Sequence, residues 1–249
     1  MPRPLTHRDI LSMAETLGLR RHDFPLHPTS RDTYLECHAK RYAHLLNTVA
    51  AHNPAPLAAL DIGPGFQTTL LHDAFPALEI DTLGGGFVPD FARRHHEFDL
   101  NDFHYPERDP GLAKYDLILF CEVIEHLYTM PETVLTRLRP HLRRGGALIV
   151  QSPNAVQWRH RVRMALGRNP YDRIIPSRMG HYREYTAAEL RQIAAAAGFA
   201  VHSLELRNYF GLRKRRITSL IDCLLWPIPS LRAGITAVLT PGTAPAQAP

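Results

Sequence analysis

The stretch that decides the fold covers residues 57–66, Leu-Ala-Ala-Leu-Asp-Ile-Gly-Pro-Gly-Phe. A short apolar run leads to Asp61, and two glycines, Gly63 and Gly65, come before a segment with helical spacing. This order is typical of a buried parallel strand that ends in a tight turn, where glycine backbone can approach a ligand closely. Open α/β folds bind small cofactors at such turns. Asp61 would repel a phosphate, but its carboxylate can accept hydrogen bonds from an ammonium group or from loop amides.

The composition is that of an ordinary globular protein with one core. Of the 249 residues, 45% are hydrophobic and 21% are charged. Cys37, Cys121 and Cys223 lie far apart without metal-ligand spacing, and no signal peptide is recognisable, so we expect reduced thiols and a cytoplasmic protein. The late apolar stretch 217–231 contains Asp222 and two prolines and is too short to span a bilayer. A net charge of +5 is compatible with phosphate, nucleic acid or anionic lipid and selects none of them.

Strand and helix patterns alternate from residue 57 onward, which predicts a doubly wound, mostly parallel sheet. The predicted strands are 57–62, 78–83, 96–99, 115–121, 147–151, 199–206 and 234–239, and the predicted helices between them are 68–74, 132–142, 187–197 (capped by Thr186) and 213–226. Two more helices are predicted upstream, one capped by Thr6 and one capped by Ser30. Residues 1–56 would then form an N-terminal helical cap, and the Pro- and Ala-rich tail 240–249 would be disordered.

Four motifs together resemble the class I S-adenosylmethionine-dependent methyltransferases. They are residues 60–65, the strand 115–120, the segment 121–127 (Cys-Glu-Val-Ile-Glu-His-Leu) and residues 143–150. The resemblance covers roughly residues 57–206 and implies a Rossmann-like, doubly wound, seven-stranded sheet with an antiparallel last strand beside its predecessor. Strands 199–206 and 234–239 suit those two positions. The methyltransferase domain would then cover 57–239, with 207–231 as an insertion between the last two strands.

The resemblance also implies where S-adenosylmethionine would bind. The turn 61–65 would lie under its methionine part, with Gln67 in place of the usual third glycine. The tip of the second strand, where the family holds the ribose with an acid, falls at Gly84, so Asp81 is the available candidate unless it is only a strand-edge charge. Asp99 matches the adenine-side acid, or else caps a turn. The predicted cofactor residues are therefore Asp61, Gly63, Gly65, Gln67, Asp81, Asp99, Leu100 and Glu122.

The segment after the fourth predicted strand carries the most reactive side chains. Glu122, Glu125 and His126 can converge if a helical turn begins there, and His181 precedes the Thr186 cap. Such a set can hold Mg²⁺ or Mn²⁺, and it resembles the ubiquinone-biosynthesis O-methyltransferases and the small-RNA 3′-end 2′-O-methyltransferases. The predicted metal ligands are Glu122, Glu125, His126 and His181. Without a metal, His126 or His181 would act as the general base on a hydroxyl, or these residues would serve packing and cofactor contacts.

Basic residues cluster after the fifth large strand, at 159–168 and again at 213–216, where an apolar helix follows. This pattern predicts a cover over the acceptor, a peripheral contact with an anionic membrane through 213–226, or ordinary packing against the sheet. The predicted function is O-methylation of a small-molecule acceptor that carries a saccharide, lipid-linked or other hydroxyl. The alternatives are an RNA 2′-O-methyltransferase and a non-catalytic cofactor-binding relative; no known RNA-binding module accompanies the motifs.

Overall fold

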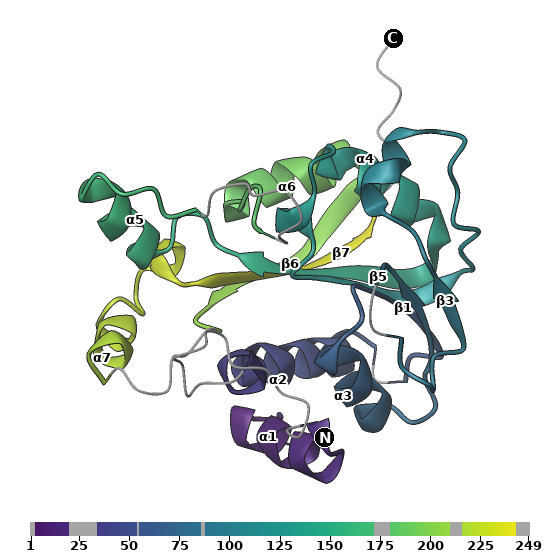
Figure 1. Ribbon diagram of the computed structural model, residues 1–249, viewed down its shortest axis with the longest axis horizontal. Coiled ribbons are helices and arrows are strands. Elements are labelled where there is room, and N and C mark those ends of the chain that lie inside the picture. Colours follow the sequence, from purple (N-terminus) through teal and green to yellow (C-terminus); the bar gives the residue numbers. More distant parts are fainter. Residues whose placement is uncertain are drawn as a thin grey trace.

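A seven-stranded sheet forms the centre of the protein, and helices cover both of its faces (Figure 1). The computed structural model describes residues 3–19, 34–53, 55–85, 88–171, 180–209 and 216–242, with only the backbone described for 216–219. The strands are β1 (Ala58–Ile62), β2 (Glu79–Leu83), β3 (Arg94–His96), β4 (Tyr115–Cys121), β5 (Leu142–Pro153), β6 (Phe199–Arg207) and β7 (Gly234–Pro241). Their order in the sheet is β3-β2-β1-β4-β5-β7-β6.

The strand directions confirm the predicted fold class. β1 to β5 run parallel to one another, whereas β7 is antiparallel to both β5 and β6 and lies between them. This is the Rossmann-like, doubly wound topology that the four motifs imply. Because the carboxyl ends of the parallel strands meet at one edge of the sheet, the loops after β1, β2 and β4 lie close together there.

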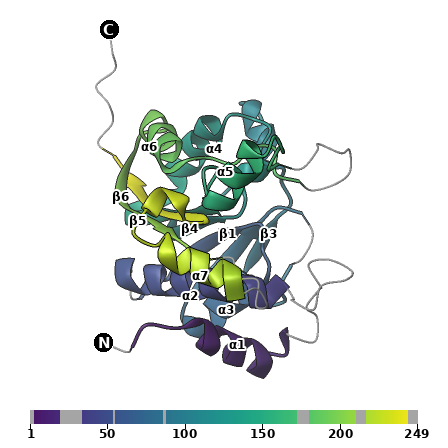
Figure 2. The ribbon, with the colours of Figure 1, turned by 90° about the vertical axis from the view of Figure 1, so that its left-hand side faces the viewer.

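The helices divide between the two faces and one end of the sheet. α1 (His7–Thr16), α2 (Tyr34–His52) and α3 (Phe66–Ala74) lie on one face, while α4 (Pro131–Leu138) and α6 (Ala187–Ala196) lie on the other (Figure 1). α5 (Trp158–Ala165) and α7 (Arg216–Leu224) project beyond one end of the sheet, and both face the viewer in Figure 2.

The central strand β4 shows why its sequence is apolar at nearly every position. Leu117 and Leu119 pack with α1, α2 and α3 on one face. Ile118 and Phe120 pack with α4 and α6 on the other. All four side chains are fully buried, because successive residues of a strand point to opposite faces and both faces are covered. α2 shares this core, so the predicted boundary at residue 56 separates segments of sequence rather than separate cores.

The helix caps predicted from local sequence signals are present, whereas the predicted position of the third strand is wrong. Thr6 and Thr186 each cap a helix, as predicted, and both caps form a complete capping box. The strand predicted at 96–99 is Arg94–His96 instead, and Asp99 caps the short 3-10 helix Leu100–His104. The Asp99 side chain accepts the Asn101 N–H, which draws the chain out of the sheet at that point.

Other boundaries moved by a few residues. α4 ends at Leu138 because Pro140 cannot continue it, and β5 begins earlier than predicted, at Leu142. β7 runs to Pro241, so the first two residues of the predicted tail belong to the sheet. Ser30, residues 213–215 and residues 243–249 lie outside the described residues. Within the described part of the chain, no helix combines the length and the apolar character needed to cross a bilayer.

Candidate functional site

Two glycine turns meet at the carboxyl ends of β1 and β2. Gly63 has φ +72° and Gly84 has φ +131°, conformations that L side chains rarely adopt. The Gly63 N–H donates to Leu83 O at 2.9 Å, and a Cβ placed on Gly84 would lie 3.7 Å from the Gly63 nitrogen. A Cβ on Gly63 would lie 3.4 Å from the Val123 side chain. Backbone therefore lines this part of the site, as the sequence pattern predicts.

Asp61 supports the turn from beneath. The side chain is fully buried and lines neither of the cavities described below. Its carboxylate accepts from Gln67 Nε2 at 2.8 Å and from Thr68 Oγ1 at 2.6 Å, while Thr68 Oγ1 accepts the Gly65 N–H. Burial raises the pKa of Asp61 to about 7, although these hydrogen bonds and the charge of Arg41 act in the opposite direction. Asp61 and Gln67 thus hold the start of α3 in place, and their side chains are not exposed to a ligand.

Arg41 on α2 is a site residue that the sequence reasoning missed. Its buried guanidinium donates to Gln67 Oε1 at 3.1 Å, to Gln151 Oε1 at 3.2 Å and to His38 Nδ1 at 3.1 Å. Its charge lowers the pKa of both Asp61 and Glu122 against the larger effect of burial. The signal was present in the sequence, because Arg41 lies three residues after His38, on the helix stripe that faces the sheet.

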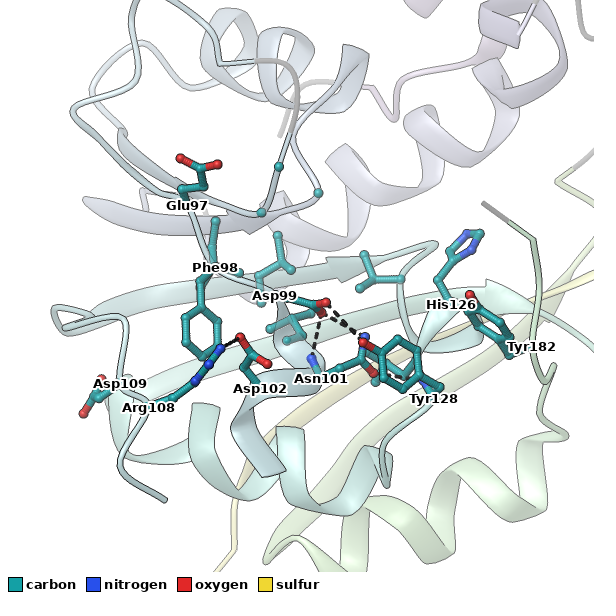
Figure 3. Close-up of a pocket in the computed structure, with 18 of the residues that line it drawn as sticks. Glu97, Phe98, Asp99, Asn101, Asp102, Arg108, Asp109, His126, Tyr128 and Tyr182 are labelled. Atoms are coloured by element: carbon teal, nitrogen blue, oxygen red, sulfur yellow. Dashed lines mark hydrogen bonds and ion pairs between the residues drawn. The ribbon is translucent and has the colours of Figure 1, made fainter. Parts of the chain in front are cut away.

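A groove of about 990 Å³ runs along the ends of β1 and β2 (Figure 3). Gly63, Gly84, Asp99 and Leu100 line it. The Asp99 carboxylate accepts from the Asn101 backbone and side-chain amides and from the Tyr128 hydroxyl, so Asp99 is both a cap and a groove residue. Glycine backbone at one end and a carboxylate in the middle suit the sulfonium amino acid and the adenosine of S-adenosylmethionine. We refer to it as the cofactor groove.

Asp81 does not reach the cofactor groove. It lies inside β2 and is buried, and its carboxylate accepts from Arg93 Nη2 at 2.7 Å and from the Tyr115 hydroxyl at 2.8 Å. Gly84 follows the last residue of β2, three residues after Asp81, and positions three apart in a strand face opposite sides of the sheet. Asp81 therefore forms an ion pair inside the structure, and it is not among the residues that line the groove, contrary to the prediction that it binds the cofactor.

A second cavity, of about 660 Å³, adjoins the groove; we call it the acceptor cavity. Glu122, Glu125, His126 and His181 line it. Ligand atoms of Glu125, His126 and His181 lie within 4.8 Å of one another, whereas Glu122 is not part of this cluster. Both carboxylate oxygens of Glu125 are buried without a hydrogen-bond partner among the described residues. A buried carboxylate next to two imidazoles fits a divalent cation, so the donor set has three of the four predicted ligands.

The histidines of this cluster are oriented by fixed acceptors. His126 Nδ1 lies 3.0 Å from Gly180 O, and His181 Nδ1 lies 3.0 Å from Glu184 Oε1. The two rings meet edge to face with centroids 5.0 Å apart. Burial lowers the pKa of His126, which keeps its imidazole neutral at physiological pH. Burial raises the pKa of Glu125, and the charge of Glu122 raises it further.

The cofactor groove and the acceptor cavity share the lining residues Gly63, Gly85, Val123 and His126. Glu122, next to Val123, has φ +57°, an uncommon backbone conformation for a residue with a side chain. The loop after β4 thus stands between the two cavities, with the neutral imidazole of His126 facing both. This arrangement can bring a group in the groove next to a group in the cavity and can accept a proton between them.

Comparison with known proteins identifies the family of the chain. A family model described as "Methyltransferase domain" matches residues 34–204. No curated protein sequence matches significantly. One matching solved structure is the methyltransferase in complex with the Haloferax volcanii Trm112 methyltransferase activator. It has 13% identity and a TM-score of 0.56, and the match covers 82% of this chain and 91% of that chain. A second is the Burkholderia thailandensis 1,6-didemethyltoxoflavin-N1-methyltransferase, with 16% identity, a TM-score of 0.53, and coverage of 98% of this chain and 93% of that chain. A third is an S-adenosylmethionine-dependent methyltransferase from Clostridium acetobutylicum, with 12% identity, a TM-score of 0.51, and coverage of 95% of this chain and 99% of that chain.

Some matched chains are longer, and this chain spans 57% and 56% of two of them. At these identities the structural matches establish the fold, while the family model covers most of the chain. The matched family model, the strand order and the glycine turns lead to one conclusion: the chain belongs to the methyltransferase-domain family and is an S-adenosylmethionine-dependent methyltransferase.

Proposed function

We propose that this methyltransferase transfers its methyl group to a hydroxyl oxygen of a small or medium-sized acceptor. The observation that carries the proposal is the cluster of Glu125, His126 and His181 in a cavity that adjoins the cofactor groove. An alcohol is a weak acid, so its methylation needs either a base that removes the hydroxyl proton or a cation that weakens the O–H bond. This cluster offers such groups at the junction of the two cavities.

Bound S-adenosylmethionine would supply an electrophilic methyl carbon attached to a sulfonium sulfur. Gly63 and Gly84 bind by backbone approach, and Asp99 accepts hydrogen bonds in the groove. When no cation is bound, His126, neutral because burial lowers its pKa, accepts the hydroxyl proton, with His181 as the second candidate base. Glu125, His126 and His181 would hold Mg²⁺ or Mn²⁺, which would supply positive charge next to the acceptor oxygen.

The charges of the acceptor cavity favour an uncharged, hydroxylated acceptor such as a saccharide, a phenol or a lipid-linked alcohol. Glu122, Glu125 and Glu184 line the cavity, and its described lining contains no lysine or arginine. An acceptor that carries phosphates beside the reacting hydroxyl would meet these carboxylates, with no lysine or arginine in the described lining to pair with the phosphates. This supports a small-molecule acceptor over the alternative of an RNA 2′-hydroxyl.

Labelled S-adenosylmethionine tests the proposal directly. We would incubate the protein with saccharide, phenol, lipid-extract and short-RNA fractions and identify the methylated atom by mass spectrometry. We expect a methyl ether in a non-RNA fraction, and we expect His126→Ala to reduce turnover at least tenfold while S-adenosylhomocysteine affinity changes little. Methylation of RNA alone, or of nitrogen or carbon alone, would overturn it.

We also propose a peripheral membrane contact, made by α7 together with α5. Asp222 on α7 accepts from Trp158 Nε1 at 2.8 Å and from Arg159 Nη2 at 3.2 Å, which ties the two helices to each other. Large apolar side chains are exposed on these helices and on the turn after α7: Val162, Met164, Leu166, Leu220, Leu224, Trp226 and Ile228. α5 also carries Arg159, Arg161 and Arg163, and apolar side chains combined with arginines suit an anionic lipid surface.

Vesicle sedimentation tests this contact. We expect the protein to sediment with phosphatidylglycerol vesicles, less so as salt rises, and not with phosphatidylcholine vesicles. Leu224→Ser with Trp226→Ser should abolish sedimentation, and Val88→Ser, an exposed apolar residue elsewhere, should not. Equal sedimentation of both variants would contradict the proposal. The basic residues 213–215 lie outside the described residues.

A further inference from the structure

Glu184 is a buried carboxylate that lines the acceptor cavity from the segment before α6. Backbone hydrogen bonds fix this segment on two sides. The Tyr182 N–H donates to Glu125 O at 2.8 Å, and the Ala155 N–H donates to Tyr185 O at 3.1 Å. The loop after β4 and the end of β5 therefore set the position of the Glu184 carboxylate.

The two oxygens of Glu184 face two different histidines. Glu184 Oε1 lies 3.0 Å from His181 Nδ1, and Glu184 Oε2 lies 3.4 Å from His160 Nδ1. An ionised carboxylate only accepts hydrogen bonds, so the hydrogen in the shorter contact belongs to His181 Nδ1. In a neutral imidazole the lone pair is then on the other nitrogen, Nε2.

His126 is arranged in the same way. Its Nδ1 lies 3.0 Å from the Gly180 carbonyl, which also only accepts. Both histidines of the cluster with Glu125 therefore have their Nδ1 hydrogen assigned by a fixed acceptor. A base or a metal ligand needs a lone pair, and a histidine in the other tautomer would offer an N–H from Nε2 instead.

We propose that Glu184 is the positioning residue that holds His181 in its Nδ1-protonated tautomer, so that Nε2 carries the lone pair used in the acceptor cavity. The use of that lone pair rests on the proposed function, but the tautomer itself does not. Glu184 acts through His181 and has no contact with the reacting atoms in this role. The other oxygen of the same carboxylate lies 3.4 Å from His160 Nδ1 on α5, a nitrogen that contacts the Ala155 carbonyl at 3.2 Å.

The matched pair Glu184→Gln and Glu189→Gln tests this role in the full-length protein. Gln at 184 keeps the size of the side chain, but its amide can present an N–H to His181 Nδ1, which a carboxylate cannot, and this would favour the other tautomer. Glu189 lies in the same region and pairs with Arg183, and Gln preserves its helix cap. Nitrogen-15 NMR of ring-labelled histidine, with the His181 signals assigned from His181→Asn, reports the tautomer of His181 directly.

We expect the Nδ1–H form of His181 to predominate in the wild type and in Glu189→Gln, and to fall below half in Glu184→Gln. Glu184→Asp, which restores an acceptor-only side chain, should regain it and also serves if Glu184→Gln does not fold. An unchanged His181 tautomer in Glu184→Gln, or an Nε2–H form in Glu184→Asp, would overturn the proposal. Because no acceptor is added, failure of the proposed O-methylation would leave this result unaffected.

Discussion

At the scale of single residues, Gly63 and Gly65 have different roles although they occupy one turn. Gly63 has φ +72° and lines both cavities, whereas Gly65 is extended, lines neither, and has open space where a Cβ would stand. We expect Gly63→Ala to weaken S-adenosylhomocysteine binding at least tenfold and to cost about 1 kcal/mol or more of unfolding free energy. Gly65→Ala should change both little. Calorimetry and urea unfolding of the two variants measure this, and equal losses would contradict it.

The buried carboxyl of Asp61 makes stability depend on pH. Burial raises its pKa in the folded protein to about 7, above the 3.8 of an unperturbed Asp. The folded state therefore binds the proton more tightly than the unfolded state. The free energy of unfolding falls as pH rises from about 4 to 7, and it stays at the lower value above pH 7. Asp61→Asn removes this titration. We expect the variant to gain unfolding free energy relative to the wild type between pH 4 and pH 8, measured by urea unfolding at each pH; a pH-independent difference would contradict this.

At the scale of elements, α2 is tied to the glycine turn by Arg41. Arg41→Leu would remove three hydrogen bonds and leave the buried Asp61 and Glu122 without their countercharge. Leaving a buried hydrogen-bonding group without its partner typically costs about 1–3 kcal/mol. We expect a large fall in the melting temperature and a weaker S-adenosylhomocysteine affinity. Lys40→Leu, at an exposed position of the same helix, is the matched control and should behave like the wild type.

The elements also show which parts of the structure local sequence signals could predict. Caps such as Thr6 and Thr186 act within four residues, so the sequence contained all the information needed to place them. Apolar runs such as β4 identified the strands. α5 was missed because none of its described residues is buried, so it has no apolar stripe; Trp158 and Arg159 are held instead by Asp222, more than sixty positions away.

The same limit applied to the site. The positions of Gly63 and of the Glu125–His126 cluster followed from strand ends and motifs, whereas Asp99 was expected at the end of a strand and instead caps a 3-10 helix. The Asp61 carboxylate binds Gln67 and Thr68 at the start of α3, a nearby contact that the motif alone did not indicate. The cluster of Glu125 and His126 with His181, which leaves out Glu122, depends on a segment far along the chain, which no local pattern encodes.

At the scale of the whole molecule, the cofactor groove and the acceptor cavity are separate spaces joined at His126, so metal and cofactor binding should be separable. We expect Mn²⁺ to bind the wild type, measured by electron paramagnetic resonance. Glu125→Gln should abolish this binding, because Glu125 has the buried, unpartnered oxygens of the cluster. Glu122→Gln, which changes a carboxylate outside the cluster, should largely keep it.

Both Glu125→Gln and Glu122→Gln should bind S-adenosylhomocysteine nearly as well as the wild type, because neither residue lines the cofactor groove. Exhaustive chelation should likewise reduce turnover while S-adenosylhomocysteine affinity persists, since the cation would serve the acceptor side. If Mn²⁺ fails to bind the wild type at millimolar concentration, or if Glu122→Gln loses it as fully as Glu125→Gln, the three-residue metal site is wrong. Turnover that survives chelation would then assign the proton transfer to His126 or His181 alone.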